Sequence, residues 1–263
     1  MHILLSDETN RQPSSDCKFF VYGGLLLPVE KLSELHSGVE FIRRETGYQP
    51  GDIFKFDTRK RPTYVPFEKA TEAKQKTVSL CIDLGCRFIA HVILHDIIKN
   101  QDPDQHILWA ADSVIGRFHK YLDNVAHDDG IVVVDNLPVK GQFQYLSDKF
   151  GHGLHLRDGT DKALSRIKLF AASCVGASHA NSAMDIVLGS FRYCINNPRN
   201  IDAAKDMMGA VMTLMWHDQD GEKLCVVDRG LILRPRIQDI QAEKYKDEYT
   251  GLFDQINVLI KDL

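Results

Sequence analysis

The chain has 263 residues, of which 44% are hydrophobic and 26% charged, and its formal net charge is −4. This composition is typical of a globular protein with a sizeable core, and the acidic balance argues against a broad surface that attracts nucleic acid by charge alone. No apolar run approaches the roughly 18–20 residues of a membrane span, and the first apolar run leads into a polar loop, so we expect neither a membrane span nor a signal peptide.

The start of the chain predicts two strands and a helix. Residues 2–6 and 17–27 have the aliphatic and aromatic composition of strands. Gly23 and Gly24 lie in the second run, where a glycine pair indicates a bulge or a close backbone approach. Apolar residues then recur at helical spacing after Pro28, which suits the first turn of a helix.

The rest of the chain predicts alternating helices and strands. Residues 52–57 alternate briefly and are expected to form a short strand, followed by the basic loop 58–62. Helices are then expected near 66–84, 104–125, 139–150, 181–196, 200–216 and 239–263, and strands near 87–94, 131–135 and 166–175, with a strand pair near 223–233.

This order of elements predicts an α/β fold, with a mixed sheet covered by helices. We expect a single domain over residues 1–263. A compositional break near 197–200 makes residues 197–263, with their strand pair and terminal helix, a candidate C-terminal extension or subdomain.

The cysteines are scattered and form no Cys-x-x-Cys pair. Most lie in apolar stretches, where a free cysteine packs as a small hydrophobic side chain. We therefore expect reduced thiols in a cytoplasmic protein. The six positions are Cys17, Cys81, Cys86, Cys174, Cys194 and Cys225.

Three acidic residues lie where ordered elements would present them. Asp7 ends the first apolar run, Asp135 ends the run 131–134, and Asp185 lies in a helical stretch. A carboxylate at the end of a buried strand is costly to desolvate unless it meets a cation, a donor or water. If the fold brings all three together, their repulsion calls for a divalent metal, and we expect Mg²⁺ or Mn²⁺. The alternative for each residue alone is a turn former or a helix cap.

Polar residues form a stripe along the helix that contains Asp185. The stripe consists of Asn181, Ser182, Asp185, Gly189 and Arg192. A glycine in the middle of a helix costs about 1 kcal/mol relative to alanine, so it often indicates that something approaches closely. Ser182 and Arg192 are therefore candidate contacts to a phosphate-bearing ligand, and the alternative is a solvated helix edge.

Basic residues gather around the expected strand 52–57. Lys55 is a candidate to neutralise a phosphate oxygen, and the run Arg59, Lys60 and Arg61 is a candidate contact to a nucleic-acid backbone. The alternative is an inert, solvated loop.

The order of these motifs resembles the bacterial domain-of-unknown-function 3800 family, whose members look like ribonuclease-H-type proteins. The resemblance covers residues 1 to about 196 and implies a ribonuclease-H-like fold. Its motifs here are Asp7-Glu8-Thr9, Phe19-Phe20-Val21-Tyr22-Gly23-Gly24, Val133-Val134-Asp135 and Met184-Asp185-Ile186-Val187-Leu188-Gly189.

The chain departs from that family at two positions. Ile53 stands where the family has the glutamate of a Glu-aliphatic-Lys motif, and Ser182 stands where it has a glutamine. Asp52, Asp57 or Glu8 is then a candidate fourth acidic group. Since neighbouring residues of a strand face opposite ways, Asp7 and Glu8 share a metal only if the strand ends between them.

Histidines form a second group of candidates. His91, His95, His152 and His155 lack the accompanying cysteines or glutamates of a metal site, so we expect them to be buried with partners or exposed. His179 lies at or just before the start of the Asp185 helix. In some ribonuclease-H-like nucleases, a histidine near the last acid positions water or helps product leave, and the alternative here is helix capping.

These observations predict a metal-dependent nuclease. In two-metal phosphodiester cleavage, one ion activates water and both stabilise charge on the scissile phosphate. Asp7, Asp135 and Asp185 would hold the metals, with Lys55 and Glu8 as further catalytic candidates. Sequence motifs of phosphate-loop, nucleophile-elbow and dinucleotide-binding proteins do not occur.

Two alternative functions remain open. One is a degraded module of the same fold, which binds nucleic acid or a protein partner without cleaving it. The other is a phosphohydrolase that acts on a small nucleotide. We expect nucleic acid as the partner, and the C-terminal strand pair and helix are a candidate interface for a second copy or another protein.

Overall fold

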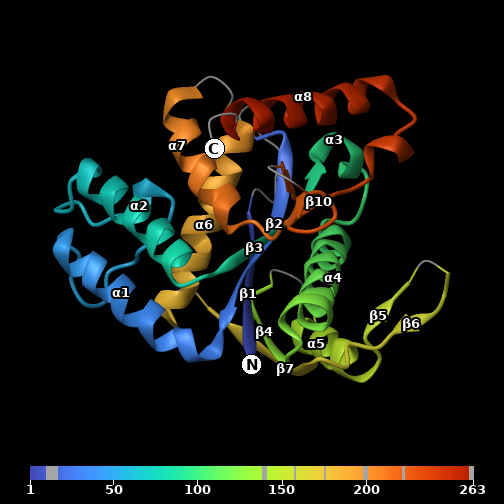
Figure 1. The fold of residues 1–263 in the computed structure, drawn as a ribbon, viewed down its shortest axis with the longest axis horizontal. Coiled ribbons are helices and arrows are strands. Elements are labelled where there is room, and N and C mark those ends of the chain that lie inside the picture. The colour runs from blue at the N-terminus through green and yellow to red at the C-terminus, as the bar shows by residue number, and fades with distance from the viewer. Residues whose placement is uncertain are drawn as a thin grey trace.

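The computed structural model describes residues 1–9, 17–137, 141–156, 158–174, 176–197, 201–220 and 223–260. Its centre is a six-stranded sheet with the strand order β10-β3-β2-β1-β4-β7 (Figure 1). The strands are β1 (His2–Thr9), β2 (Phe19–Pro28), β3 (Arg87–Leu94), β4 (Gly130–Asp135), β7 (Ile167–Ser173) and β10 (Leu231–Leu233). β2 pairs antiparallel with β1 and β3, whereas β4, β7 and β10 pair parallel with their neighbours.

Helices cover both faces of this sheet. The helices are α1 (Leu32–Glu45), α2 (Phe67–Asp83), α3 (His95–Ile98), α4 (Pro103–Tyr121), α5 (Gln142–Gly151), α6 (His179–Asn196), α7 (Ile201–Leu214) and α8 (Glu243–Ile260). One core cluster joins the sheet to α1, α2, α6, α7 and α8, and the other joins it to α4 and α5. The predicted mixed sheet flanked by helices is therefore confirmed.

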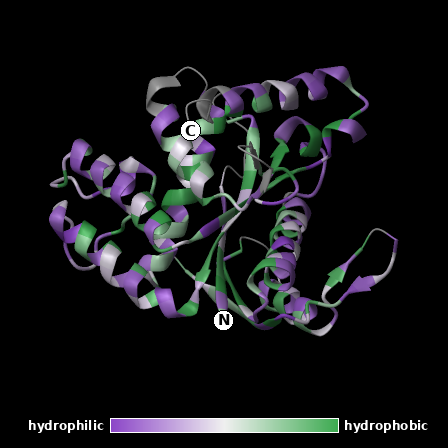
Figure 2. Ribbon diagram, viewed as in Figure 1, coloured by the Kyte–Doolittle hydropathy of each residue, from purple (hydrophilic) through white to green (hydrophobic). Residues whose placement is uncertain are grey.

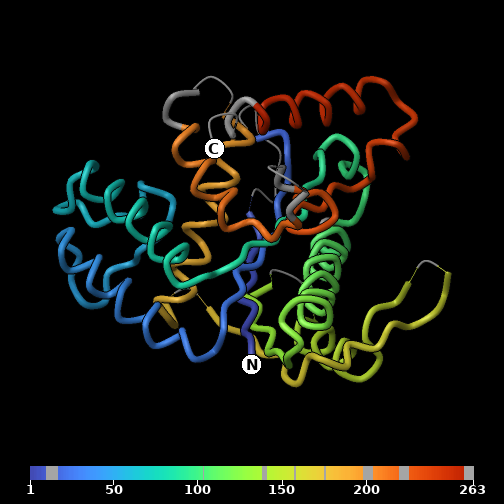
Figure 3. The backbone as a smooth tube through the Cα atoms, viewed as in Figure 1, coloured from blue at the N-terminus to red at the C-terminus, as the bar shows by residue number. Residues whose placement is uncertain are grey.

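Alternation along β1 places its side chains in these two cores. Ile3 and Leu5 belong to the core under α6, whereas Leu4 belongs to the core under α4. Figure 2 shows hydrophobic residues concentrated in the central strands, as expected for a sheet buried on both faces. Figure 3 shows α1 and α6 side by side, although more than a hundred residues separate them in the sequence.

The glycine pair of β2 permits the close approach that its sequence predicted. A Cβ at Gly23 would lie 2.8 Å from Leu188 Cδ1, and one at Gly24 would lie 2.5 Å from Leu4 Cδ1. Gly23 therefore lets α6 approach the sheet next to the candidate carboxylates.

The C-terminal region contains the expected terminal helix and a pair of short strands, but the pair is not the one expected. β8 (Asp218–Asp220) pairs with β9 (Lys223–Cys225), but residues 231–233 leave that pair and join β3 at the edge of the main sheet as β10. The prediction of a strand pair over 223–233 was wrong here, because Leu231 and Leu233 pack into the core under α6.

Residues 52–57 are the second difference, since they form a loop and not a strand. Phe54 is buried, and the backbone N–H of Phe56 donates to the side chain of Asp185 at 2.6 Å. A short alternating run has too few residues to distinguish a strand from a loop that buries every second side chain.

All six cysteines are free, with Cys81, Cys86 and Cys194 buried and Cys174 and Cys225 exposed. In the described part of the chain, each helix is too short or too polar to cross a membrane.

Candidate functional site

Asp7 and Asp135 lie side by side on one face of the sheet. β1 continues through Thr9, so Asp7 lies within the strand and does not end it. Its pairing with β4 stops at Ser6 opposite Val134, which places Asp7 next to Asp135, on strands about 4.8 Å apart. Asp7 continues the Ile3 and Leu5 alternation, and Asp135 that of Ile131 and Val133, so both face α6.

Asp185 approaches the same face from α6. This helix begins at His179, because the Ser178 side chain caps it by accepting from the Asn181 backbone N–H at 3.1 Å. Asp185 Oδ2 accepts the Phe56 N–H at 2.6 Å, and Asp185 Oδ1 lies 3.6 Å from Lys55 Nζ. The fold thus brings the three predicted aspartates, which we call the acidic site, to one face of the sheet.

The pKa values of the acidic site show that these charges repel one another. Burial, together with the charges of Glu8, Asp135 and Asp185, raises the pKa of Asp7 to about 8. Burial also raises the pKa of Asp185, although the Phe56 N–H and Lys55 oppose that shift. The Phe56 N–H and Lys55 therefore do not offset all the negative charge of the acidic site.

The described residues hold no ready-made group of three His, Cys, Asp or Glu side chains positioned to bind a metal ion. The three carboxylates are close enough to repel but are not drawn into a shared ligand geometry. Their chemistry still fits a hard divalent cation, because Mg²⁺ and Mn²⁺ prefer carboxylate oxygens and one ion would offset the excess charge.

Glu8 occupies the strand position that alternation assigns to the other face of the sheet, although it also lines the concave region next to Asp7. It follows the Leu4 and Ser6 alternation, towards the core under α4. Its charge helps to raise the pKa of Tyr22, whose hydroxyl lies 3.0 Å from Ser6 Oγ. Because β1 does not end between Asp7 and Glu8, their side chains diverge as the sequence predicted.

Lys55 and the basic residues of the loop 58–62 make different contacts. Lys55 faces Asp185, and the exposed Arg59 pairs with Asp57 at 3.0 Å. Arg61 instead donates to the backbone carbonyls of Thr58 and Val65, so its guanidinium holds the loop in shape. Lys60 is exposed.

Gly189 has the close neighbour that its helical position indicated, but this neighbour is Phe56. A Cβ at Gly189 would lie 2.3 Å from Phe56 Cγ. Arg192 and Lys74 also lie over the Phe56 ring, at 5.6 and 4.8 Å from its centroid. The glycine thus lets the loop seat Phe56 against α6, which aims the Phe56 N–H at Asp185.

Lys74 was not identified from the sequence. It is buried on α2, where its ammonium donates to Thr58 Oγ1 at 2.7 Å, and burial lowers its pKa. A lysine among the apolar positions of a predicted helix is the signal that would have found it.

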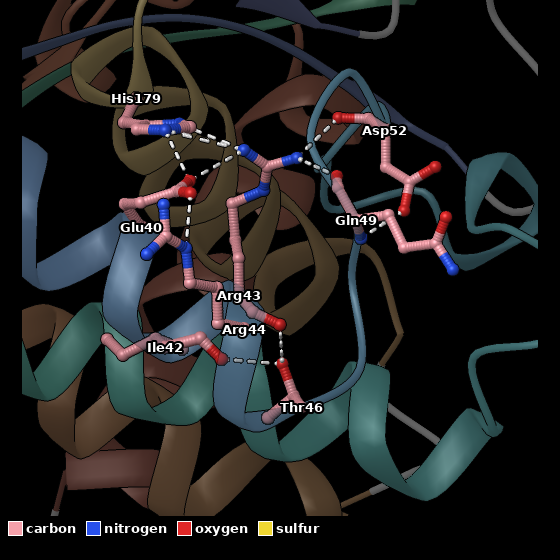
Figure 4. Close-up of polar contacts among 8 residues, drawn as sticks. All are labelled: Glu40, Ile42, Arg43, Arg44, Thr46, Gln49, Asp52 and His179. Carbon is pink, nitrogen blue, oxygen red and sulfur yellow. Dashed lines mark hydrogen bonds and ion pairs between the residues drawn. The ribbon is translucent and has the colours of Figure 1, made fainter.

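His179, a candidate from the sequence, belongs to a group that joins α1 to α6, and the sequence did not indicate its partner Glu40 (Figure 4). Glu40 Oε2 accepts from His179 Nε2 at 2.8 Å and from Arg43 Nη1 at 3.1 Å. The other Arg43 nitrogen, Nη2, donates to the carbonyls of Gln49 and Asp52. Arg43 is buried, and it ties the loop to both helices.

Asp185 separates two concave regions. The α1–α6 pocket has a volume of about 410 Å³ and is lined by Lys55, Asp135, Ser182 and the Glu40–Arg43–His179 group, among others. The β1–α6 groove has a volume of about 230 Å³ and is lined by Asp7, Glu8, Arg59, Asp185 and Arg192, among others. Of the predicted substrate contacts, Ser182 therefore lies in the pocket and Arg59 and Arg192 lie in the groove.

The four other candidate histidines line neither of these regions. His91 and His95 are buried, and burial lowers the pKa of His91 to about 3. His152 and His155 both lie 3.1 Å from Asp148 carboxylate oxygens, and His155 lies 2.6 Å from Asp161. We call these four residues the hairpin cluster, because β5 (Leu154–His155) and β6 (Asp161–Lys162) form a hairpin there.

Comparisons with known proteins identify no close relative. No protein-family model and no curated protein matches the chain. A crystal structure of a mutant of Bst-RNase HIII is similar over 99% of this chain and 70% of that chain, with 12% sequence identity and a TM-score of 0.41.

Proposed function

We propose that the chain is a Mg²⁺- or Mn²⁺-dependent nuclease of ribonuclease-H-like fold. The supporting observation is that Asp7, Asp135 and Asp185 share one face, with the pKa values of Asp7 and Asp185 raised by burial and repulsion. A site with this excess of hard oxygen donors is stabilised by a divalent cation. Nucleic acid is the proposed partner, and the free cysteines suit the cytoplasm.

Each residue then has a defined role. When bound, the metal activates water and stabilises charge on the phosphate. Asp7, Asp135 and Asp185 hold the metal, and Lys55 contacts a phosphate oxygen from the loop side of Asp185. Arg59 and Arg192 line the groove next to Asp7, where they contact flanking phosphates.

A binding module without cleavage is the second candidate. Two observations favour it: Ile53 occupies the position of the family's glutamate, and the described residues lack a three-ligand group in binding geometry. In that case the same face would bind nucleic acid through Arg59 and Arg192 and would take up metal weakly.

Metal binding and cleavage should be measured on the same variants. Wild-type protein is expected to bind Mn²⁺ in calorimetry and to cleave labelled oligonucleotides. Asp185→Asn and Asp135→Asn should each reduce cleavage on the order of 10³-fold, because several kcal/mol of transition-state stabilisation is lost with the metal. Asp148→Asn in the hairpin cluster is the matched control and should retain activity.

The outcomes separate the two candidates. Mn²⁺ binding with cleavage that disappears in both site variants supports the nuclease. Oligonucleotide binding with neither Mn²⁺ uptake nor cleavage refutes it and supports the module.

A further inference from the structure

The α1–α6 pocket has the size and walls of a site for one small organic group. Its volume of about 410 Å³ falls within the roughly 300–1,000 Å³ of small-ligand pockets. It opens directly onto Asp135, Asp185 and Lys55 of the proposed catalytic region. A group bound in it would therefore be continuous with a phosphate held at the acidic site.

The lining of the pocket also includes apolar residues and histidine rings. Beyond Lys55 its lining includes Pro50, the half-exposed Ile53 and the exposed ring of His36. The rings of His36 and His179 have centroids 4.8 Å apart. Ring-bearing and aliphatic side chains provide surface on which a nucleobase stacks, and they lie here beside the charged Glu40, Arg44 and Asp52.

Hydrogen-bonding groups line the same cavity. Ser182 lines it from the first turn of α6, and its hydroxyl is of the kind that contacts a sugar or the edge of a base, whereas the Ser178 hydroxyl is engaged in capping the helix through Asn181. The pocket thus combines carboxylates and Lys55, hydroxyl groups, and a ring and an aliphatic side chain, which are the kinds of group that contact the phosphate, sugar and base of a nucleotide.

The far wall of this pocket is held in place by contacts within the protein. Arg43 connects Glu40 and His179 to the carbonyls of Gln49 and Asp52, as Figure 4 shows. Asp52 also accepts from the Tyr64 hydroxyl at 2.6 Å. Because these contacts order the loop beside Ile53 in advance, a ligand binds without the cost of ordering it.

We propose that the α1–α6 pocket binds one unpaired nucleoside adjacent to the scissile phosphate, so that the substrate strand is single-stranded at the site. This inference rests on the proposed nuclease function and specifies its substrate class. A base within a duplex is stacked and paired and cannot enter such a cavity unless it is first extruded. The neighbouring phosphates on the other side of Asp185 lie in the β1–α6 groove, near Arg59 and Arg192.

Calorimetry with small probes tests the base-binding wall directly. Adenosine 5′-monophosphate, ribose 5-phosphate and inorganic phosphate are titrated into the full chain in the presence of Mn²⁺. The adenosine nucleotide should bind about tenfold more tightly than ribose 5-phosphate, because stacking contributes about 1–3 kcal/mol per base. His36→Ala and Ile53→Asp should each remove most of that difference and leave ribose 5-phosphate binding unchanged.

The matched control is His152→Ala, an exposed histidine in the hairpin cluster, which should bind all probes as wild type does. Circular dichroism confirms that each variant is folded. Equal affinity of wild type for the nucleotide and for ribose 5-phosphate, or a nucleotide affinity unaffected by both pocket variants, overturns the inference.

Cleavage assays separate this inference from the proposed function. Wild-type protein should cleave a single-stranded oligonucleotide at least tenfold faster than the same sequence in a blunt duplex. Equal rates on both refute the unpaired-substrate inference and leave the nuclease intact. Base-dependent binding without cleavage of either substrate refutes the nuclease and leaves the pocket assignment standing.

Discussion

The acidic site and the hairpin cluster both gather aspartates, yet their charges are balanced in opposite ways. The Asp185 and Asp148 side chains are 21% and 32% exposed, and Asp185 lies in the more deeply buried surroundings, so burial as well as the neighbouring groups separates them. Burial works against ionisation of Asp148, but hydrogen bonds from His155 and His152 outweigh it and lower its pKa. At Asp185, burial prevails over the Phe56 N–H and Lys55, and the pKa rises.

This difference indicates which of the two aspartate clusters a bound cation would stabilise. In the hairpin cluster the imidazoles complete the charge balance, and Asp161 and Asp148 in turn raise the pKa of His155. In the acidic site, negative groups face one another across β1, β4 and α6. Clustered carboxylates are thus evidence for a metal site only where the surrounding protein leaves their charge uncompensated.

The largest expected effect is the pH dependence of stability contributed by Asp7. Its pKa is about 8 in the folded chain and near 3.9 when unfolded, so the folded state holds an extra proton between those values. Stability then falls with rising pH in that window, by up to about 1.4 kcal/mol per pH unit. Asp7→Asn should remove this slope in urea unfolding with chelator present, and an unchanged slope would contradict the burial of charge at Asp7.

Metal should stabilise the acidic site and leave the hairpin cluster unaffected. With Mn²⁺ at a hundred times its dissociation constant, wild type and Asp148→Asn should each gain about 2.7 kcal/mol of unfolding free energy. Asp135→Asn should gain far less, because a ligand is missing. Thermal unfolding with and without Mn²⁺ measures this, and an equal gain in Asp135→Asn would place the metal elsewhere.

Gly189→Ala tests the packing that supports the acidic site. The new methyl would overlap Phe56, and the resulting overpacking should cost about 1–3 kcal/mol. Activity should also fall, because the Phe56 N–H is displaced from Asp185. Gly251→Ala on α8 is the matched control, since its Cβ would meet nothing within 4 Å, and it should stabilise the helix by about 0.5–1 kcal/mol.

Asp148→Asn should have the smallest effect and the opposite pH dependence. The lowered pKa of Asp148 means that its carboxylate contributes stability above about pH 4 and loses that contribution as the pH falls further. Because Asp148 and its histidine partners are partly exposed, Asp148→Asn should lower the unfolding free energy at pH 7 by less than about 1 kcal/mol, and this loss should vanish in acid. Urea titrations at pH 7 and pH 3 detect it, and destabilisation that persists in acid would mean that packing matters more than charge.

The sequence predicted those parts of the site that follow from local periodicity. The run 131–134 identified β4 and its terminal Asp135, and helical spacing placed Asp185 on a polar stripe. Alternation along β1 separated Asp7 from Glu8. Each of these features follows from the side-chain periodicity of a single strand or helix.

What could not be predicted depends on contacts between distant segments. Gly189 indicated a close neighbour, but nothing near it in the sequence points to Phe56, whose N–H donates to Asp185, 129 residues later in the chain. The Glu40–Arg43–His179 group likewise forms only when α1 packs against α6. Residues 52–57 were wrongly predicted to be a strand, because the backbone N–H of Phe56 donates to the side chain of Asp185 and not to a neighbouring strand.

The hydrogen bond from the Phe56 N–H to Asp185 gives the protein an internal reporter. In deuterated water this loop amide should exchange slowly, although it belongs to no helix or strand. A cation that recruits the same carboxylate oxygen weakens the bond and quickens exchange at this single position. Isotope exchange at Phe56 would therefore reveal occupancy of the site without substrate, label or turnover.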